Sequence, residues 1–231
     1  MVPGYDPASR AACRFDTPAA TVFEVDHSGI ATDDAILWAL LDEAEQARAA
    51  RFVVAAVKRR FVLSHAALRL TLARRVGGDA RDIRYGAIAN GKPCLLRRPG
   101  CGHVEFNMSH SGDRVLIALS DDRPVGVDVE ALRPIDRLRG LAEKICSGPE
   151  LAVLDGHPAD DASAFLLRLW TCKEAIVKAT GLGLSVDPRR VVLPNAILAG
   201  YPTAELPFDG TTWRLHDLGS PGYAAALAHA A

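Results

Sequence analysis

Two carboxylates lie on one side of a short apolar segment. Residues 124–130 read P-V-G-V-D-V-E, and the alternation of an extended chain places the valines on one face and Asp128 and Glu130, with Gly126, on the other. Neighbouring carboxylates repel, so the pair needs a cation, a shared proton or open water. Mg²⁺ meets that need, because one or two carboxylates commonly hold it together with substrate phosphates. The alternative is a charged strand end that faces solvent.

A second polar group follows a helical spacing. Trp170, Glu174 and Lys178 fall at i, i+4 and i+8, so they share one face of a predicted helix. As an ordinary ion pair, Glu174 and Lys178 would contribute only about 0.3 to 0.5 kcal/mol. On the same face, Glu174 could complete a site with the two strand carboxylates, and Lys178 could neutralise charge that builds on a phosphoryl group.

Three further segments could bind phosphate, although each also has a plainer interpretation. Residues 106–112, F-N-M-S-H-S-G, place Ser109 and His110 at the end of an alternating strand, where ligands are often bound. No neighbouring acid orients this imidazole, which argues against a Ser-His nucleophile. The basic run 58–60 is typical of a solvated helix surface, and residues 90–93, N-G-K-P, are typical of a hairpin turn. Phosphate loops of the ATPase and dinucleotide-binding types are absent from the sequence.

The composition restricts the class of protein. The 231 residues are 49% hydrophobic, enough for a substantial core, and 27 basic against 28 acidic residues give a net charge of -1. That balance supplies no field for attracting nucleic acid or an anionic membrane. Five cysteines without a C-x-x-C pair argue against a disulfide framework or closed zinc site. With no apolar leader region in residues 1–18 and no run of 18 apolar residues, we expect a soluble, cytoplasmic protein.

The elements that position these residues alternate between helical and extended patterns. Apolar spacing predicts helices over residues 36–76, with a start at residues 32–34 and a stop at Gly77 and Gly78. From Asp82 the period changes to two, which predicts strands. Strands predicted at 115–119 and 125–130 flank a turn at 121–124, as a hairpin or as a crossing between sheets.

This turn is our predicted boundary, between one half at residues 1–121 and another at 122–231. In the second half, Ser147 and Glu150 form a capping-box pattern, and a long helix is predicted over 161–180. Antiparallel strands are predicted at 191–193, 212–215 and 223–227. This order, helices followed by strands in each half, predicts an α+β fold with two halves. Each half has helices packed on a small, mostly antiparallel sheet.

The order of four motifs is more specific than any one of them: N-G-K-P, F-N-M-S-H-S, V-G-V-D-V-E and W-T-C-K-E-A-I-V-K. This series resembles the Sfp-type 4′-phosphopantetheinyl transferases over residues 43–185. The resemblance implies two pseudo-symmetric α+β halves in one polypeptide, with coenzyme A and Mg²⁺ between them. It also implies a likeness of residues 45–69 to the basic helical region of that family.

The resemblance implies roles for the motif residues. Asp128, Glu130 and Glu174 look like the magnesium ligands, Glu174 also activates the carrier serine, and Lys178 stabilises the pyrophosphate. The predicted coenzyme A contacts are Lys178, Lys92 with Pro93, Ser109 with His110, which lies near the 3′-phosphate, and Arg48 and Arg60. Glu45 stands where some relatives have a phosphate-facing lysine, so other residues of that helix would build the basic pocket.

The implied reaction moves the 4′-phosphopantetheine arm of coenzyme A to a serine of an acyl or peptidyl carrier protein and releases 3′,5′-ADP. The implied enzyme depends on Mg²⁺. The length of the chain, with both halves present, predicts a monomer, and the net charge of -1 predicts no nucleic-acid or membrane partner. Two alternatives stay open at this stage: a metal-dependent phosphohydrolase with the same acidic cluster, and a noncatalytic module that binds carrier proteins or nucleotides.

Overall fold

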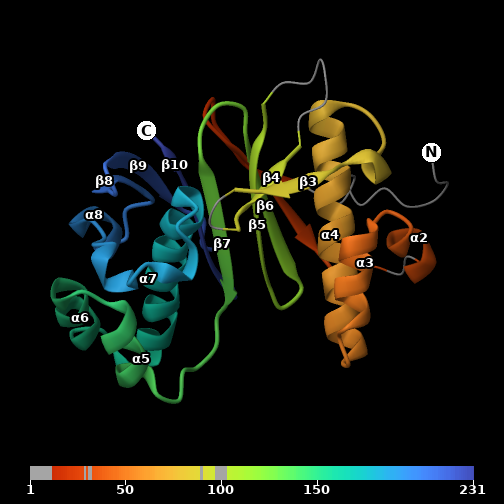
Figure 1. The fold of residues 1–231 in the computed structure, drawn as a ribbon. Helices are drawn as coiled ribbons and strands as arrows, with labels where there is room; N and C mark the ends of the chain where they lie inside the picture. The colour runs from red at the N-terminus through yellow and green to blue at the C-terminus, as the bar shows by residue number, and fades with distance from the viewer. Residues whose placement is uncertain (1–11, 29, 31–32, 89–90, 97–102) are drawn as a thin grey trace.

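The chain folds into layers, with helices on both outer sides and two sheets between them (Figure 1). The computed structural model describes residues 12–231 apart from positions 29, 31–32, 89–90 and 97–102. The long helix α4 (Ala55–Val76) covers the first sheet, and the long helix α7 (Ala159–Thr180) covers the second. In the described part of the chain, no helix is both long and apolar enough to cross a membrane.

The first half builds an antiparallel sheet of strand order β1-β2-β6-β5 and a separate two-stranded ribbon of β3 and β4. Its elements besides α4 are β1 (Ala12–Asp16), β2 (Thr21–Asp26), α2 (Asp34–Trp38), α3 (Glu43–Ala50), a 3₁₀ turn (Ala80–Asp82), β3 (Tyr85–Ala87), β4 (Pro93–Leu95), β5 (Glu105–Ser111) and β6 (Arg114–Ser120).

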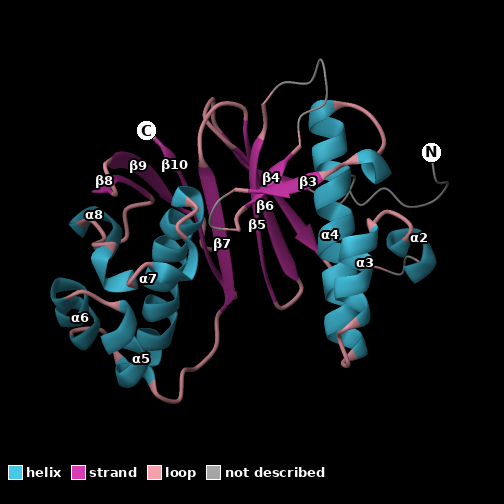
Figure 2. Ribbon diagram, viewed as in Figure 1, coloured by secondary structure: helices cyan, strands magenta, loops and turns pink. Residues whose placement is uncertain are grey.

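The second half builds an antiparallel sheet of strand order β7-β10-β9-β8. Its elements besides α7 are β7 (Val125–Ala131), α5 (Leu138–Ile145), α6 (Gly148–Asp155), 3₁₀ turns (Gly183–Ser185 and Pro188–Arg190), α8 (Asn195–Leu198), β8 (Thr203–Phe208), β9 (Thr211–Asp217) and β10 (Tyr223–Ala230). Figure 2 shows β7 and the first sheet between α7 and α4, with β8 and β9 of the second sheet extending past α7 toward α8. The predicted α+β class, with helices packed on an antiparallel sheet in each half, is confirmed.

Three apolar clusters hold the layers together. One joins α4 to the first sheet, and a second joins α7 to the second sheet. The third lies between the sheets, where Val125, Val127 and Val129 of β7 meet β6 and β10. The valine face of β7 is therefore core, as its alternation predicts, and its other face turns toward α7.

Helix ends follow the predicted signals. Gly77 at φ 77° ends α4, and Gly181 at φ 71° ends α7; both backbones occupy a region that favours glycine. Ser147 and Glu150 form the predicted capping box of α6. The starting signal at residues 32–34 is only partly testable, because Thr32 lies outside the described residues, but Asp33 caps α2.

Some strand predictions were wrong or incomplete. Residues 191–193 form no strand, although Val191 and Leu193 are buried. Side chains take their backbone hydrogen bonds: Val191 accepts one from Lys173, and Leu193 donates one to Glu150. The sequence also gave no indication of β1, β2 or the edge strand β8.

The turn at residues 121–124 is a crossing between sheets. Strand β6 pairs with β2 and β5, whereas β7 pairs with β10, so the two strands that flank the turn are not a hairpin. This crossing carries the chain from the first sheet into the strand that bears the carboxylates. In the N-G-K-P motif, Asn90 lies outside the described residues.

Candidate active site

The close packing of α7 on β7 positions the carboxylates. Gly126 makes it possible, because a Cβ built there would lie 2.2 Å from the carbonyl oxygen of Ala175 and 2.3 Å from the amide nitrogen of Ala179. No side chain fits in that space. The glycine of V-G-V-D-V-E thus lets the helix lie directly on the strand, so that the polar face of α7 meets Asp128.

Asp128 is the centre of a buried polar network. The ammonium of Lys178 lies 2.6 Å from Asp128 Oδ1 and donates to Ser109 Oγ at 2.9 Å, while Ser109 donates to the same carboxylate oxygen at 2.7 Å. Asp128 is 5% exposed, which excludes a carboxylate that simply faces solvent. Burial raises the pKa of Asp128, and the charge and hydrogen bond of Lys178 oppose that rise.

Glu130 and Glu174 flank this network. Glu130 is partly exposed on the same face of β7 and accepts a hydrogen bond from Ser111 Oγ at 3.0 Å. Glu174 comes from α7, and its pKa is raised by burial first and then by the negative charges of Asp128 and Glu130, against the opposing charge of Lys178. A raised pKa makes a half-buried carboxylate a stronger base than an exposed one, which suits a general base.

The alternation of polar residues along β5 has a structural explanation, because these side chains reach the second sheet. Strands β5 and β7 belong to different sheets, and side chains of β5 hydrogen bond to β7: the amide of Val127 donates to Asn107 Oδ1 at 2.9 Å and that of Ala131 to Ser111 Oγ at 3.0 Å. Ser109, between them, reaches Asp128. Every second residue from 107 to 111 therefore joins the two halves of the molecule, a role that the recognised alternation of this strand did not reveal.

His110, on the opposite face of β5, lies among cationic groups. Its pKa is lowered by partial desolvation and then by the positive charges of Lys178, His65, Arg48 and Arg60. Arg60 also lies 3.4 Å from a carboxylate oxygen of Asp113 in an exposed ion pair. The positive charges of the predicted Arg48, Arg60 and Lys178 all act on His110, and that of His65 from α4 joins them. Such a cluster suits an anionic group.

Glu45 has a structural role instead of a phosphate-facing one. It is buried, forms a capping box with Asp42 at the start of α3, and accepts from Arg69 Nε at 2.5 Å. Its other oxygen lies 2.7 Å from His65 Nδ1. The fully buried Arg69 is thereby compensated. The D-x-x-E pattern of residues 42–45 could have indicated the cap; the partnership with Arg69, 24 positions away, has no local signal.

Lys92 lies on the far side of Gly126. Its ammonium donates to the carbonyl oxygens of Val125 at 3.0 Å and Ala179 at 3.2 Å, which ties β7 to the last turn of α7. The side chain is largely buried, and burial lowers its pKa while Glu105 opposes the change. The contact of Lys92 and Pro93 with coenzyme A stays a prediction.

The donor set at Asp128 fits a hard cation. Within the described residues, no three His, Cys, Asp or Glu side chains are gathered closely enough to hold a metal ion as they stand. Lys178 is the partner of Asp128 Oδ1 in this arrangement. The other oxygen, Asp128 Oδ2, is buried and has no hydrogen-bond partner in the described part of the chain. A buried carboxylate oxygen without a partner is costly unless a ligand uses it. Oxygen ligands of this kind are those that Mg²⁺ prefers.

Lys173 of the W-T-C-K-E motif belongs to the core. Its side chain and that of Glu150 are fully buried, with Nζ 2.7 Å from Glu150 Oε2, and Nζ also donates to the carbonyl oxygens of Pro188 and Val191. The capping pattern of Glu150 is visible in the sequence, whereas its pairing with Lys173 has no local signal. The ion pair anchors α7 to α6 and to the segment that follows the helix, so it supports the site without facing it.

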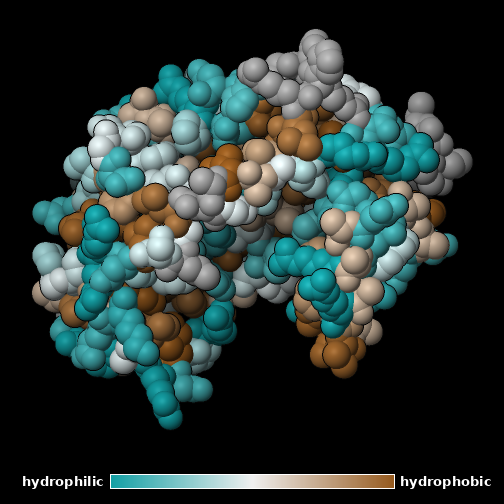
Figure 3. Space-filling view, viewed as in Figure 1, coloured by the Kyte–Doolittle hydropathy of each residue, from teal (hydrophilic) through white to brown (hydrophobic). Residues whose placement is uncertain are grey.

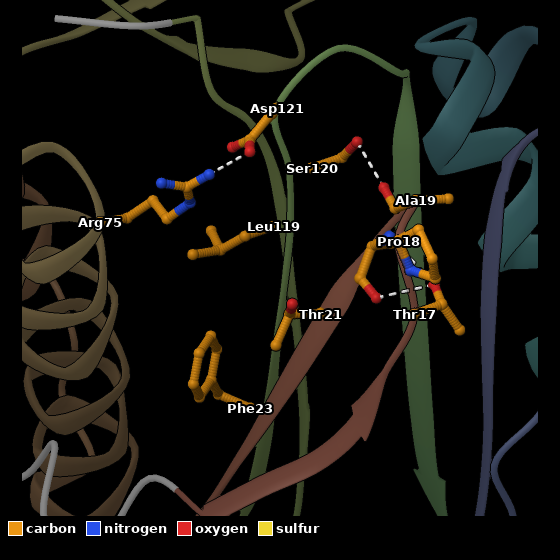
Figure 4. Close-up of a pocket in the computed structure, with 10 residues that line it drawn as sticks. Thr17, Pro18, Ala19, Thr21, Phe23, Arg75, Leu119, Ser120 and Asp121 are labelled. Atoms are coloured by element: carbon orange, nitrogen blue, oxygen red, sulfur yellow. Dashed lines mark hydrogen bonds and ion pairs between the residues drawn. The ribbon is translucent and has the colours of Figure 1, made fainter.

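A separate pocket lies away from these residues. It is lined by the β1–β2 turn, the end of β6 and Arg75, which forms an ion pair with Asp121 (Figure 4). None of the predicted site residues lines it. The space-filling view instead shows a notch between the two helical layers, whose wall on the α3–α4 side is largely hydrophilic (Figure 3).

The chain is similar to known proteins over nearly all of its described length. Residues 124–228 match the 4′-phosphopantetheinyl transferase superfamily, and residues 31–122 match the N-terminal region of 4′-phosphopantetheinyl transferases. The chain is 36% identical over 149 residues to the 4′-phosphopantetheinyl transferase HetI of Nostoc, a match that covers 64% of this chain and 63% of that protein.

Two Bacillus proteins give related matches. The chain is 35% identical over 178 residues to the 4′-phosphopantetheinyl transferase psf-1 of Bacillus pumilus, covering 77% of this chain and 69% of that protein. It is 33% identical over 127 residues to the 4′-phosphopantetheinyl transferase Sfp of Bacillus subtilis, and that match covers 54% of the relative. Together with the motif order and the fold, these matches establish that the chain belongs to the 4′-phosphopantetheinyl transferase superfamily.

Proposed function

We propose that this chain transfers the 4′-phosphopantetheine arm of coenzyme A to a serine of an acyl or peptidyl carrier protein and releases 3′,5′-ADP. The observation that carries the proposal is the meeting of Asp128 and Glu174 with Lys178, beside a cationic cluster around His110. Carboxylates next to cations suit the transfer of a phosphoryl-linked group from a pyrophosphate to an alcohol. The family membership supports the same activity.

Asp128, Glu130 and Glu174 would hold Mg²⁺, with the partnerless Asp128 Oδ2 as one ligand. When bound, the ion would neutralise charge on the pyrophosphate and make its phosphorus more electrophilic. The ammonium of Lys178 compensates Asp128 in the structure. We infer that it turns from Asp128 to a phosphate oxygen when the substrate binds, where it stabilises the leaving 3′,5′-ADP.

Glu174 would accept the proton of the attacking serine, directly or through a water. Its raised pKa comes from burial and from Asp128 and Glu130, so its basicity is greater than that of an exposed glutamate. The bond that forms joins the serine oxygen to the β-phosphorus of coenzyme A, and the bond that breaks joins that phosphorus to the 3′,5′-ADP oxygen. The proton leaves the serine for Glu174.

The cluster around His110 would bind the nucleotide end of coenzyme A. Arg48, Arg60 and His110 would receive the 3′-phosphate, with Ser109 and Lys178 toward the pyrophosphate and Lys92 with Pro93 at the edge of the nucleotide. The electrostatic coupling of His110 to the arginines supports this arrangement. His65, held by Glu45, would supply a group that the sequence alone did not identify.

We also propose that the protein is a cytoplasmic monomer, with the boundary between its halves lying between residues 121 and 122. The sheet crossing at 121–124 and the two family matches, which end and begin at 122 and 124, support that boundary. The phosphohydrolase and the noncatalytic module are not favoured by the comparisons.

A single substitution tests the assignment of Glu174. Glu174→Gln keeps the size of the side chain and removes the base, so transfer of phosphopantetheine to an apo carrier protein should fall by about 10² to 10⁴. Transfer is followed by intact mass of the carrier. Glu143→Gln, in an exposed position on α5, is the matched control and should transfer normally. Full activity of Glu174→Gln would contradict the assignment.

A further inference from the structure

We propose that His27 is a further substrate-binding residue, whose imidazole hydrogen bonds to the anionic group received by His110 and Arg60. The inference rests on the proposed function, in which that group is the 3′-phosphate of coenzyme A. His27 Nε2 is buried and has no hydrogen-bond partner in the described part of the chain. The residue is only 8% exposed. Buried polar atoms nearly always have a partner, so an orphan beside a cationic cluster indicates a ligand.

The backbone places His27 at the correct end of the first sheet. It follows β2 directly, and its amide donates to the carbonyl oxygen of Asp113 at 2.7 Å, which fixes it against the β5–β6 turn. The side chain of Asp113 in turn lies 3.4 Å from Arg60 Nε. His110 lies near the end of β5, beside the β5–β6 turn, and pairs with Val115 of β6. His27, Arg60 and His110 therefore converge on one corner of the molecule.

The charges around His27 fit a neutral donor. Burial lowers its pKa to about 4, with further lowering by His110 and Arg60 and opposition from Asp113 and Asp26. The imidazole is consequently uncharged at neutral pH and carries one N–H. A neutral donor adds a hydrogen bond to a phosphate without adding repulsion to a site that already holds Arg48, Arg60 and Lys178. Leucine would fill the same space without an unpartnered nitrogen, so packing alone does not explain the histidine.

The test compares coenzyme A with dephospho-coenzyme A, which lacks the 3′-phosphate. Dissociation constants are measured by calorimetry for the wild type, His27→Leu and His27→Gln, after urea unfolding has shown that each variant is folded. His27→Leu should bind coenzyme A about tenfold to a hundredfold more weakly, as expected for the loss of a hydrogen bond to a charged group, and bind dephospho-coenzyme A unchanged. His27→Gln, which retains an Nε donor, should recover most of the preference for coenzyme A over dephospho-coenzyme A.

The control is His103→Leu at the opposite end of β5, where an exposed histidine pairs with Glu105. It should leave both constants unchanged. An equal loss for both ligands in His27→Leu, or no change in their ratio, would overturn the role of His27. If the wild type modifies a carrier but His27→Leu leaves the ratio of the two dissociation constants unchanged, the role of His27 is wrong and the proposed function stands. If the wild type binds neither ligand, the proposed function falls and the inference with it.

Discussion

Replacement of Gly126 by alanine should separate α7 from β7 and disable the site. The added Cβ would lie 2.2 Å from Ala175 O and 2.3 Å from Ala179 N, whereas ordinary contact begins near 3.4 Å. Both obstacles are helix backbone, which cannot rotate away as a side chain can, so α7 must move by roughly 1 Å. Overpacking of this kind costs about 1 to 3 kcal/mol of unfolding free energy. A misplacement of roughly 1 Å at catalytic groups can cost on the order of 10² in rate. Glu174 and Lys178, which we propose act in the reaction, both lie on the displaced helix.

The experiment pairs Gly126→Ala with Gly140→Ala. Nothing lies within 4 Å of a Cβ at Gly140, which is exposed within α5, so alanine there should be neutral or stabilise the helix by about 0.5 to 1 kcal/mol. Urea unfolding measures the free energy, and intact mass of an apo carrier measures transfer at a temperature where both variants are folded. If Gly126→Ala transfers phosphopantetheine at the rate of the wild type with unchanged unfolding free energy, the packing argument is refuted.

Two other predictions concern stability. Lys173→Met removes one partner of a fully buried ion pair and leaves Glu150 uncompensated, so the unfolding free energy measured in urea should fall by about 3 to 5 kcal/mol; a loss below about 1 kcal/mol would contradict the pairing. His216 and His229 are buried with their Nε2 atoms 3.2 Å apart, and burial lowers the pKa of His216 to about 4. Between about pH 6.5 and pH 4 the unfolded His216 binds a proton that the folded one does not. The folded protein therefore keeps its full stability above about pH 6.5 and loses stability as the pH falls toward 4. His216→Phe should therefore show a shallower acid-side decline in urea midpoint than the wild type, and an identical decline would exclude this linkage.

The sequence predicts those parts of the site that depend on local periodicity. The alternation of β7 places Asp128 opposite the valines, and the helical spacing of Glu174 and Lys178 places both toward that strand. The order of the motifs then relates these elements to one family. The physical need for Gly126 was not apparent, because it arises from the approach of a helix nearly fifty residues away.

Other features depend on contacts that no local pattern reveals. Strand β2 lacks clean alternation because Val22 faces the cluster between the sheets and Val25 faces the cluster under α4, so both faces are covered. The apolar run at 191–193 has the composition of a strand, yet Lys173 and Glu150 use its backbone groups. His27 gives no sequence signal, since a lone histidine is more often a satisfied core residue; only its orphaned nitrogen beside Arg60 and His110 distinguishes it.

Phosphopantetheinyl transfer is measured by the intact mass of an apo acyl or peptidyl carrier protein after incubation with this protein, coenzyme A and Mg²⁺. The carrier should gain the mass of one phosphopantetheine group on a serine, and EDTA should prevent the gain. No gain across carriers of fatty-acid, polyketide and peptide synthesis, by protein that binds coenzyme A, would contradict the transferase assignment.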